Sequence, residues 1–127
     1  MAAGDLKGPE CVVIEVTAGA TITVGQLVHL EADGKWDPTA SADTGKFGVA
    51  LDAGVDTGLI RVCIWGRVEV TASAAAIAKG AYVIADAGVV KDAGTITETT
   101  VYGTIVGTAM EAFASGETKT VWIGLVG

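Results

Sequence analysis

Histidine and cysteine are scarce in this sequence, with one histidine and two cysteines among 127 residues, and this scarcity excludes most enzyme chemistry. Ser-His-Asp and Cys-His catalysis would both depend on His29, which lies in the apolar run QLVHL and is interpreted as an ordinary strand residue. A zinc site needs closely spaced ligands, whereas Cys11, His29 and Cys63 are far apart in the chain. We therefore expect no enzyme, no catalytic residue, no metal site and no cofactor.

Basic side chains are also few, since eight lysines and arginines stand against fifteen acidic residues and give a net charge of −7. They are scattered along the chain as Lys7, Lys35, Lys46, Arg61, Arg67, Lys79, Lys91 and Lys119. Phosphate binding needs clustered basic residues, so we expect no direct binding to nucleic acid or to an anionic membrane. Every apolar run is too short to cross a bilayer, and the amino terminus MAAGDLKGPE lacks the pattern of a signal peptide.

The two cysteines lie in apolar surroundings, Cys11 in CVVIEV and Cys63 in RVCIW. Apolar flanks of this kind are typical of buried thiols, which are favoured here over a disulfide between the two residues. Free thiols are in turn typical of proteins made in a reducing compartment, so we expect synthesis in the cytoplasm.

Glycine, valine, isoleucine and alanine are abundant instead, with 18 glycines and 50% hydrophobic residues. β-Branched residues interrupted by glycine predict many short strands joined by tight turns. We expect an all-β, mainly antiparallel fold with one short helix near 71–79, which Thr71 or Ser73 caps and Gly80 ends. Gly66 is expected to bend a long strand. The expected strands cover residues 10–17, 25–30, 47–51, 59–70, 82–85, 89–90 and 118–126, with a polar loop at 37–46.

An internal repeat is the most informative pattern in the chain. Its matched elements are VGQLVHLEADGKW (24–36) with AKGAYVIADAGVV (78–90), FGVALDA (47–53) with VGTAMEA (106–112), and GLIRVCIWGRV (58–68) with GETKTVWIGLV (116–126). The common order favours a duplication, spanning about 18–68 and 74–127, over chance similarity between glycine-rich strands. Neither unit could bury its apolar face alone, so we expect both to form one compact β-barrel or sandwich at 10–127, after an extended arm at 1–9.

Ligand-binding motifs are weak in this sequence. GTIVG and GVALDAG match neither a P-loop nor a dinucleotide-binding turn. DAGVDTG (52–58) has the rhythm of a calcium loop without its closing glutamate, so its aspartates are interpreted as turn residues, with calcium at a subunit junction as an open alternative. Trp36, Trp65 and Trp122 could stack on a sugar, but the last two fall in equivalent late strands, where a core or interface role is favoured.

A resemblance to a known family covers residues 18–127 and is carried by the order GQLVHL…GKFGVALDA…IRVCIWGRVEVTASAAAIAKGAYVIAD…VVKDAG…GTIVGTAMEA…GETKTVWIGLVG. This order resembles the small capsid decoration, or cement, proteins of tailed phages and related viruses. The resemblance implies a compact β protein on the outer surface of the assembled capsid, with no catalytic residues. It also implies a homo-oligomer, with a trimer favoured, that binds the major capsid protein.

The polar arm before Glu10 suits such a role, since an extended segment can lie along a neighbouring subunit or add a strand to it. Within the arm, Asp5, Leu6, Lys7 and Pro9 are the candidate capsid contacts. We therefore expect a structural protein of a bacteriophage virion, which stabilises the capsid by bridging major capsid protein subunits.

Two other classes of function are weighed against this one. Trp36 beside the polar loop suggests a carbohydrate- or cell-surface-binding β module displayed on a virion. An enzyme would need a pocket with acid–base partners around His29, and it is the least favoured class.

Overall fold

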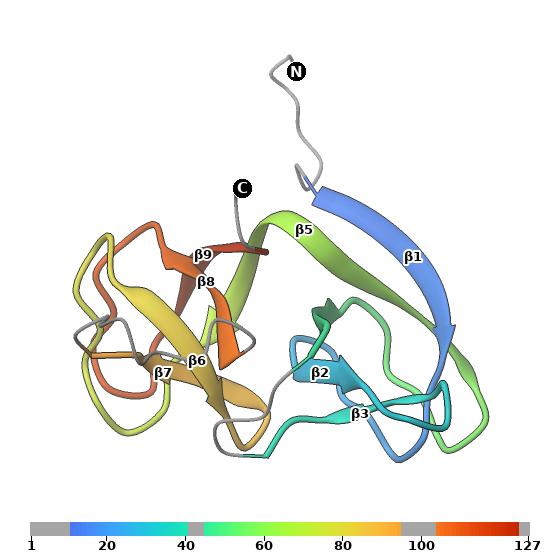
Figure 1. Cartoon of the computed structure of the whole chain (residues 1–127). Helices are drawn as coiled ribbons and strands as arrows, with labels where there is room; N and C mark the ends of the chain where they lie inside the picture. Colours follow the sequence, from blue (N-terminus) through green and yellow to red (C-terminus); the bar gives the residue numbers. More distant parts are fainter. Residues whose placement is uncertain (1–10, 41–44, 95–103, 125–127) are drawn as a thin grey trace.

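The computed structural model describes residues 11–40, 45–94 and 104–124, which form one sheet of nine strands. All paired strands run antiparallel, so the all-β, antiparallel prediction is confirmed. The order across the sheet is β3-β2-β4-β5-β9-β8-β6-β7, and β1 pairs with β5 (Figure 1). The strands are β1 (Cys11–Thr17), β2 (Leu27–Leu30), β3 (Trp36–Pro38), β4 (Phe47–Ala50), β5 (Leu59–Thr71), β6 (Tyr82–Asp86), β7 (Val89–Asp92), β8 (Ile105–Ala109) and β9 (Thr118–Ile123).

Strand β5 connects the two halves of the molecule, because its thirteen residues pair with different strands along their length. Residues 59–66 pair with β1, and two of them, Val62 and Cys63, also pair with β4. Residues 66–71 pair with β9, so β5 arches from one lobe to the other (Figure 1). We call β1 to β4 with the first half of β5 the N-terminal lobe, and the second half of β5 with β6 to β9 the C-terminal lobe.

The arch of β5 contains a bulge and a glycine. The register between β1 and β5 shifts between Val12 and Val13, which leaves Ile64 as an extra residue on β5. Gly66 has a φ of 113°, which residues with a side chain rarely adopt. The bend that the sequence predicts at Gly66 is therefore present.

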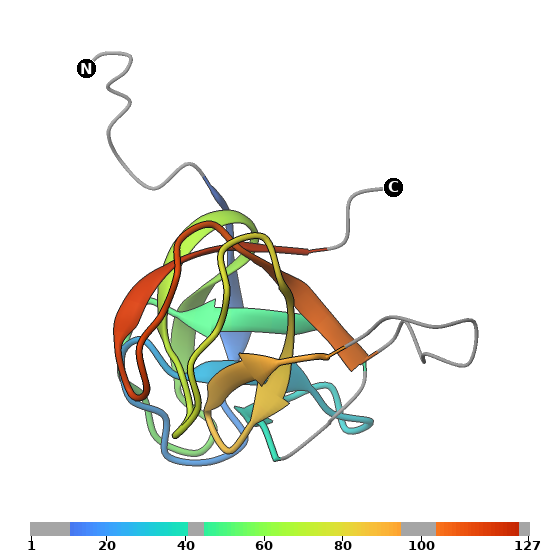
Figure 2. The ribbon, with the colours of Figure 1, turned by 90° about the vertical axis from the view of Figure 1, so that its left-hand side faces the viewer.

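Each lobe curls until its first strand meets its third. In the N-terminal lobe, Ala18 directly after β1 forms a parallel bridge with Trp36 in β3. In the C-terminal lobe, Ala72 directly after β5 forms the same bridge with Val90 in β7. Figure 2 looks onto the C-terminal lobe and shows its strands curled around a common centre. Each lobe is thus a small, partly closed barrel.

The same main-chain hydrogen bonds recur in the two lobes. Gly25 and Gly80, which the sequence pairs as entry points of equivalent strands, donate to Ala50 and Ala109, at 2.8 Å in each case. Ile22 and Gly54 bond to each other in both directions, as Ile77 and Phe113 do in the other lobe. The Leu51 amide donates to the Arg61 carbonyl, and the equivalent Met110 amide donates to the Thr120 carbonyl. The two lobes therefore share one main-chain frame.

This shared frame includes β1, which is equivalent to the second half of β5. Residues 15–18 and 69–72 both read EVTA. Val13 of β1 faces Cys63 of β5, as Arg67 of β5 faces Trp122 of β9. Strand β5 therefore completes the first lobe and begins the second, so the repeat starts earlier in each half than 18 and 74. Duplication as its origin stays a prediction.

Apolar side chains fill the lobes in two clusters. The N-terminal cluster consists of Ala18, Ile22, Val28, Trp36, Ala50, Ile60 and Val62. The other cluster is centred on Val70, Ile77, Val83, Val90, Phe113 and Val121 of the C-terminal lobe. It also contains Leu27, Phe47 and Val49 from the N-terminal lobe, so the two lobes pack against each other through a common core.

The helix predicted near 71–79 is wrong. Thr71 is the last residue of β5, and the amides of Ser73 and Ile77 donate across the lobe to Val90 and Phe113, at 2.8 and 3.0 Å. A segment this short nucleates a helix only at a cost in free energy, and the cross-lobe hydrogen bonds hold it extended instead. No helix in the described ranges is long and apolar enough to cross a membrane.

Each predicted strand corresponds to an observed one. Two observed strands were not among those predicted: β8, which overlaps the repeated element at 106–112, and β3. Residues 37–46 were expected to form a loop, but β3 covers Trp36–Pro38 and pairs with β2. Proline was a poor signal for a strand, because it cannot donate a main-chain hydrogen bond. Pro38 is tolerated because β3 is an edge strand with β2 as its partner along the sheet.

Candidate functional site

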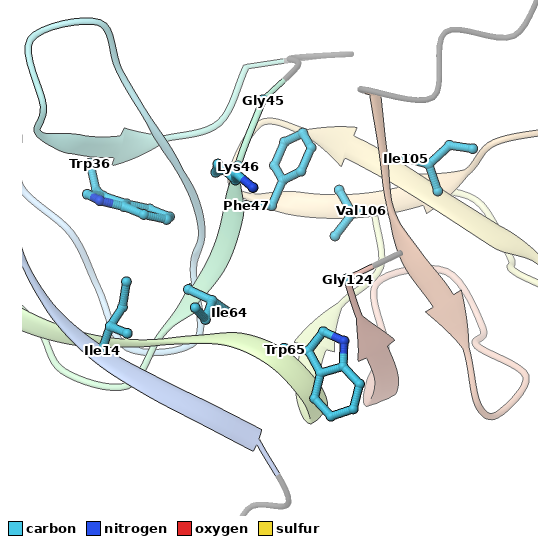
Figure 3. Close-up of a pocket in the computed structure, with 10 residues that line it drawn as sticks. All are labelled: Ile14, Trp36, Gly45, Lys46, Phe47, Ile64, Trp65, Ile105, Val106 and Gly124. Carbon is cyan, nitrogen blue, oxygen red and sulfur yellow. The ribbon is translucent and has the colours of Figure 1, made fainter. Parts of the chain in front are cut away.

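A groove of about 590 Å³ lies between the two lobes, along the inner side of β5 (Figure 3). Strands β1, β3 and β4 supply one wall, β8 supplies the other, and β5 lies between them. The residues that line it are Ile14, Trp36, Gly45, Lys46, Phe47, Ile64, Trp65, Ile105, Val106 and Gly124. Lys46 is the one charged residue of this set, so the groove is an apolar site.

Trp36 forms part of the N-terminal wall because a tight turn fixes the start of β3. The Lys35 amide donates to Asp33 Oδ1 at 2.9 Å, and the Glu31 amide donates to the Lys35 carbonyl at 2.8 Å. The indole that follows is only 6% exposed and belongs to the N-terminal core. Trp36 therefore presents little of its face for stacking on a sugar ring.

His29 lies behind the groove rather than in it. Its ring stacks on the ring of Phe47, with a centroid distance of 6.5 Å and an interplanar angle of 24°. Its Nε2 is 2.6 Å from Glu31 Oε2, and the residue is 9% exposed. His29 thus supports the Phe47 side of the groove as a buried strand residue.

Trp65 is the most exposed aromatic side chain of the groove, at 43%. Its ring meets Trp122 edge to face, with centroids 4.7 Å apart and planes at 80°. A Cβ on Gly124 would lie 2.8 Å from Trp65 Cδ1, so the absence of a side chain at Gly124 makes room for the indole. The two tryptophans pack on each other within the chain, and the exposed part of Trp65 offers apolar surface to a partner.

An open strand edge lies beside the groove. Among the described residues, β1 pairs only with β5, apart from the bridge that follows it at Ala18. Val12 and Val13 of β1 are half exposed, and Val12 pairs with Trp65 in the groove. An apolar groove next to an open strand edge can take an extended polypeptide, whose main chain bonds to the edge while its side chains enter the groove.

In the loop DAGVDTG (52–58), whose aspartates the sequence indicates as turn residues, Asp52 pairs with Arg61. Asp52 Oδ2 accepts hydrogen bonds from the Arg61 amide and Nε, both at 3.0 Å, and Oδ1 accepts one from Nη2 at 2.9 Å. These bonds hold the pKa of Asp52 at about 2, chiefly through the Arg61 side chain. Over the described ranges no three His, Cys, Asp or Glu side chains are grouped as metal ligands.

The predicted site residues and the observed groove do not coincide. Asp5, Leu6, Lys7 and Pro9 lie outside the described residues. The groove could not be predicted from the sequence, because most of its lining comes from five strands that only the sheet topology brings together. The available signal was the late-strand tryptophan Trp65, which the repeat had already singled out.

Comparison with known proteins places this architecture among solved folds. No protein-family model matches the chain, and no curated protein matches it. The structure is similar to the crystal structure of the head fiber gp8.5 N base of bacteriophage phi29, with a TM-score of 0.61 and 18% sequence identity. The match covers 89% of this chain and 93% of the phage chain. At this identity the likeness concerns the fold.

Proposed function

We propose that the chain is a structural protein of a bacteriophage virion and acts as a decoration, or cement, protein on the outer surface of the capsid. It binds the major capsid protein, bridges neighbouring subunits and acts as a homo-oligomer, with a trimer favoured. The fold likeness to the phi29 head fiber base carries this proposal, because it extends over nearly the whole of both chains. No catalytic role is proposed.

The surface of the N-terminal lobe supports a polypeptide as the partner. The groove is apolar, Trp65 is partly exposed in it, and β1 has an open edge. Exposed aromatic residues of this kind often contribute most of the binding energy at protein interfaces. The net charge of −7 keeps the protein soluble at the high local concentration that a capsid coat requires.

Binding to capsids of the parent phage that lack the protein tests the proposal. The purified chain should sediment with these capsids at a copy number comparable to that of the capsid subunits, and raise their melting temperature. Trp65→Ser should weaken binding by roughly tenfold or more, because the residue offers an aromatic anchor in the groove. Tyr82→Ser is the matched control, since Tyr82 is an aromatic residue of similar exposure outside the groove.

Absence of the protein from purified virions would refute the structural role. If Trp65→Ser and Tyr82→Ser weakened capsid binding equally, the groove would not be part of the capsid interface. A chain without residues 1–9 tests the arm separately, since it should keep its fold and lose part of its affinity. Unchanged affinity would show that Asp5, Leu6, Lys7 and Pro9 are not capsid contacts.

A carbohydrate- or cell-surface-binding module is the second candidate, and the exposed part of Trp65 is the observation that favours it. Sugar binding would use the indole face as a stacking surface, with polar groups around it. Among the described residues that line the groove, Lys46 is the one charged side chain, which makes this lining a poor match for a hydroxyl-rich ligand. Binding on a glycan array that Trp65→Ser abolishes would favour this candidate over capsid binding.

A further inference from the structure

Each lobe has a pair of side chains at equivalent diagonal positions across two antiparallel strands. In the C-terminal lobe, the contact is the edge-to-face pair of Trp65 and Trp122. Trp65 lies two residues before Arg67, which faces Trp122 across the β5–β9 pair. The shared frame makes β1 equivalent to the second half of β5, and the first half of β5 equivalent to β9.

In the N-terminal lobe, Cys11 and Cys63 occupy the same two positions. Val13 faces Cys63 across the β1–β5 pair, and Cys11 lies two residues before Val13. A diagonal pair of this kind can bring side chains into contact across two antiparallel strands, as the two tryptophans show. The repeated frame therefore places the two cysteines at diagonal positions of the β1–β5 pair.

The contacts of the two cysteines agree with this placement. Cys11 is partly buried and packs against the core cluster that contains Cys63. Cys11 lies close enough to Cys63 to contribute to the raised pKa of the Cys63 thiol. Cys63 Sγ is also 3.7 Å from the Trp65 carbonyl oxygen. Both cysteines are free thiols, as the sequence favoured, but they are neighbours although they are far apart in the chain.

We propose that Cys11 and Cys63 are a redox-active pair, which an oxidant converts into a disulfide that clamps the start of β1 to β5. The clamp ties down the strand whose outer edge is open beside the groove. Its biological setting rests on the proposed function, because a virion passes from a reducing cytoplasm to an oxidising exterior. The chemistry itself requires only the folded chain and an oxidant.

Glutathione disulfide is a sufficient oxidant for the reaction. The Cys11 thiolate attacks one sulfur of glutathione disulfide, which forms a mixed disulfide and releases one glutathione thiolate. The Cys63 thiolate then attacks Cys11 Sγ, which closes the protein disulfide and releases the second glutathione. The protein loses two protons and two electrons, and one glutathione disulfide becomes two glutathiones.

The different burial of the two thiols sets their order in this reaction. Loss of solvation by burial, together with the Cys11 contact, raises the pKa of the Cys63 thiol to about 12. Cys63 is therefore a poor first nucleophile, and the more accessible Cys11 reacts first. The second step should be slow, because it waits for deprotonation of Cys63.

Intact mass spectrometry of the purified full chain, incubated with glutathione disulfide and then with dithiothreitol, tests the proposal. The oxidised monomer should weigh less by two hydrogens, react with no thiol-alkylating reagent, and recover both thiols on reduction. Its melting temperature should rise by roughly 5–15 °C, because a disulfide between residues 11 and 63 restricts the unfolded chain.

Cys11→Ser removes the partly buried partner and leaves the buried core residue in place, so it is the main control. It should show no melting shift with oxidant and should stop at a mixed disulfide or an unmodified thiol. Cys63→Ala is a second variant, which avoids placing a hydroxyl in the core. Two reactive thiols after oxidation, a dimer linked between chains, or a disulfide without a melting shift would each overturn the clamp, and none of these results bears on capsid binding.

Discussion

The two lobes have the same main-chain frame but fill it with different side chains. Trp36 fills the N-terminal lobe, and its equivalent in the C-terminal lobe is the smaller Val90. Phe113 fills the C-terminal lobe, and its equivalent in the N-terminal lobe is Gly54. A side chain at Gly54 would collide with Ile60, next to the volume that the N-terminal core already fills.

This exchange shows which part of the fold the repeat preserves. Trp36 and Phe113 both fill the core of their lobe, but they enter from positions that are not equivalent. Interiors must be filled to a constant density, and several combinations of side chains can meet that demand. The hydrogen-bonded frame has less freedom, because each bond depends on the position of the main chain. Equivalent positions therefore offer matched tests of the frame.

The largest expected effect comes from the glycines at equivalent positions of β4 and β8. A Cβ on Gly107 would overlap the main-chain carbonyl oxygen of Trp122, which cannot move without breaking the β8–β9 pairing. A Cβ on Gly48 would lie 3.2 Å from the Cys63 carbonyl oxygen, which is tight but tolerable. Gly107→Ala should lower the free energy of unfolding by roughly 3 kcal/mol or more, and Gly48→Ala by about 1 kcal/mol.

Urea unfolding of the two variants and the parent chain measures this difference. A single shared transition is expected in all three, because β5 belongs to both lobes. Equal losses for the two alanines would show that the strands approach each other equally closely in both lobes, contrary to the structure.

Much of the frame, but little of the groove, could be predicted from the sequence. The strands and their order along the chain could be predicted, because valine-rich runs and glycine turns are local signals. The repeated EVTA at 15–18 and 69–72 was available too, but its first copy lies before the glycine that marked the repeat. The false helix arose because alanines near 74–76 favour a helix locally, while the bonds that hold the segment come from distant Val90 and Phe113.

A smaller effect is expected at Thr57, which has a φ of 69° where the equivalent Gly116 has a φ of 70°. Both amides donate into their own lobe, to the carbonyls of Ala18 and Ser73, at 2.8 Å each. A β-branched residue is strained in this conformation and glycine is not. Thr57→Gly should therefore raise the free energy of unfolding by about 0.5–1 kcal/mol, after the entropy gained by the unfolded chain is subtracted.

The reverse substitution, Gly116→Thr, should destabilise the chain by about 1–2 kcal/mol in the same urea titration. Gly25→Ala, at another glycine with positive φ, is the control for the general cost of a side chain in this region. A destabilised Thr57→Gly would mean that contacts of the threonine side chain outweigh its backbone strain.

The smallest effect concerns the carboxylates that cap equivalent turns, Asp52 beside Arg61 and Glu111 beside Thr120. Hydrogen bonds from the Arg61 side chain and amide lower the pKa of Asp52 from 3.8 to about 2. Hydrogen bonds from the Thr120 hydroxyl and amide lower the pKa of Glu111. Since both folded pKa values lie below the unfolded ones, each carboxylate stabilises the fold above its unfolded pKa, and that stability is lost as the pH falls.

For Asp52 this stability is lost as the pH falls from 3.8 to about 2. Asp52→Asn should therefore reduce the change of melting temperature with pH across this window. Glu111→Gln should flatten it less, because Thr120 supplies no charge. The side chains of Asp52 and Arg61 are both open to solvent. The effect of Asp52→Asn on the melting temperature should therefore be small and should shrink further as salt is added. A larger change for Glu111→Gln than for Asp52→Asn would show that the ion pair with Arg61 is not what distinguishes the N-terminal turn from its equivalent.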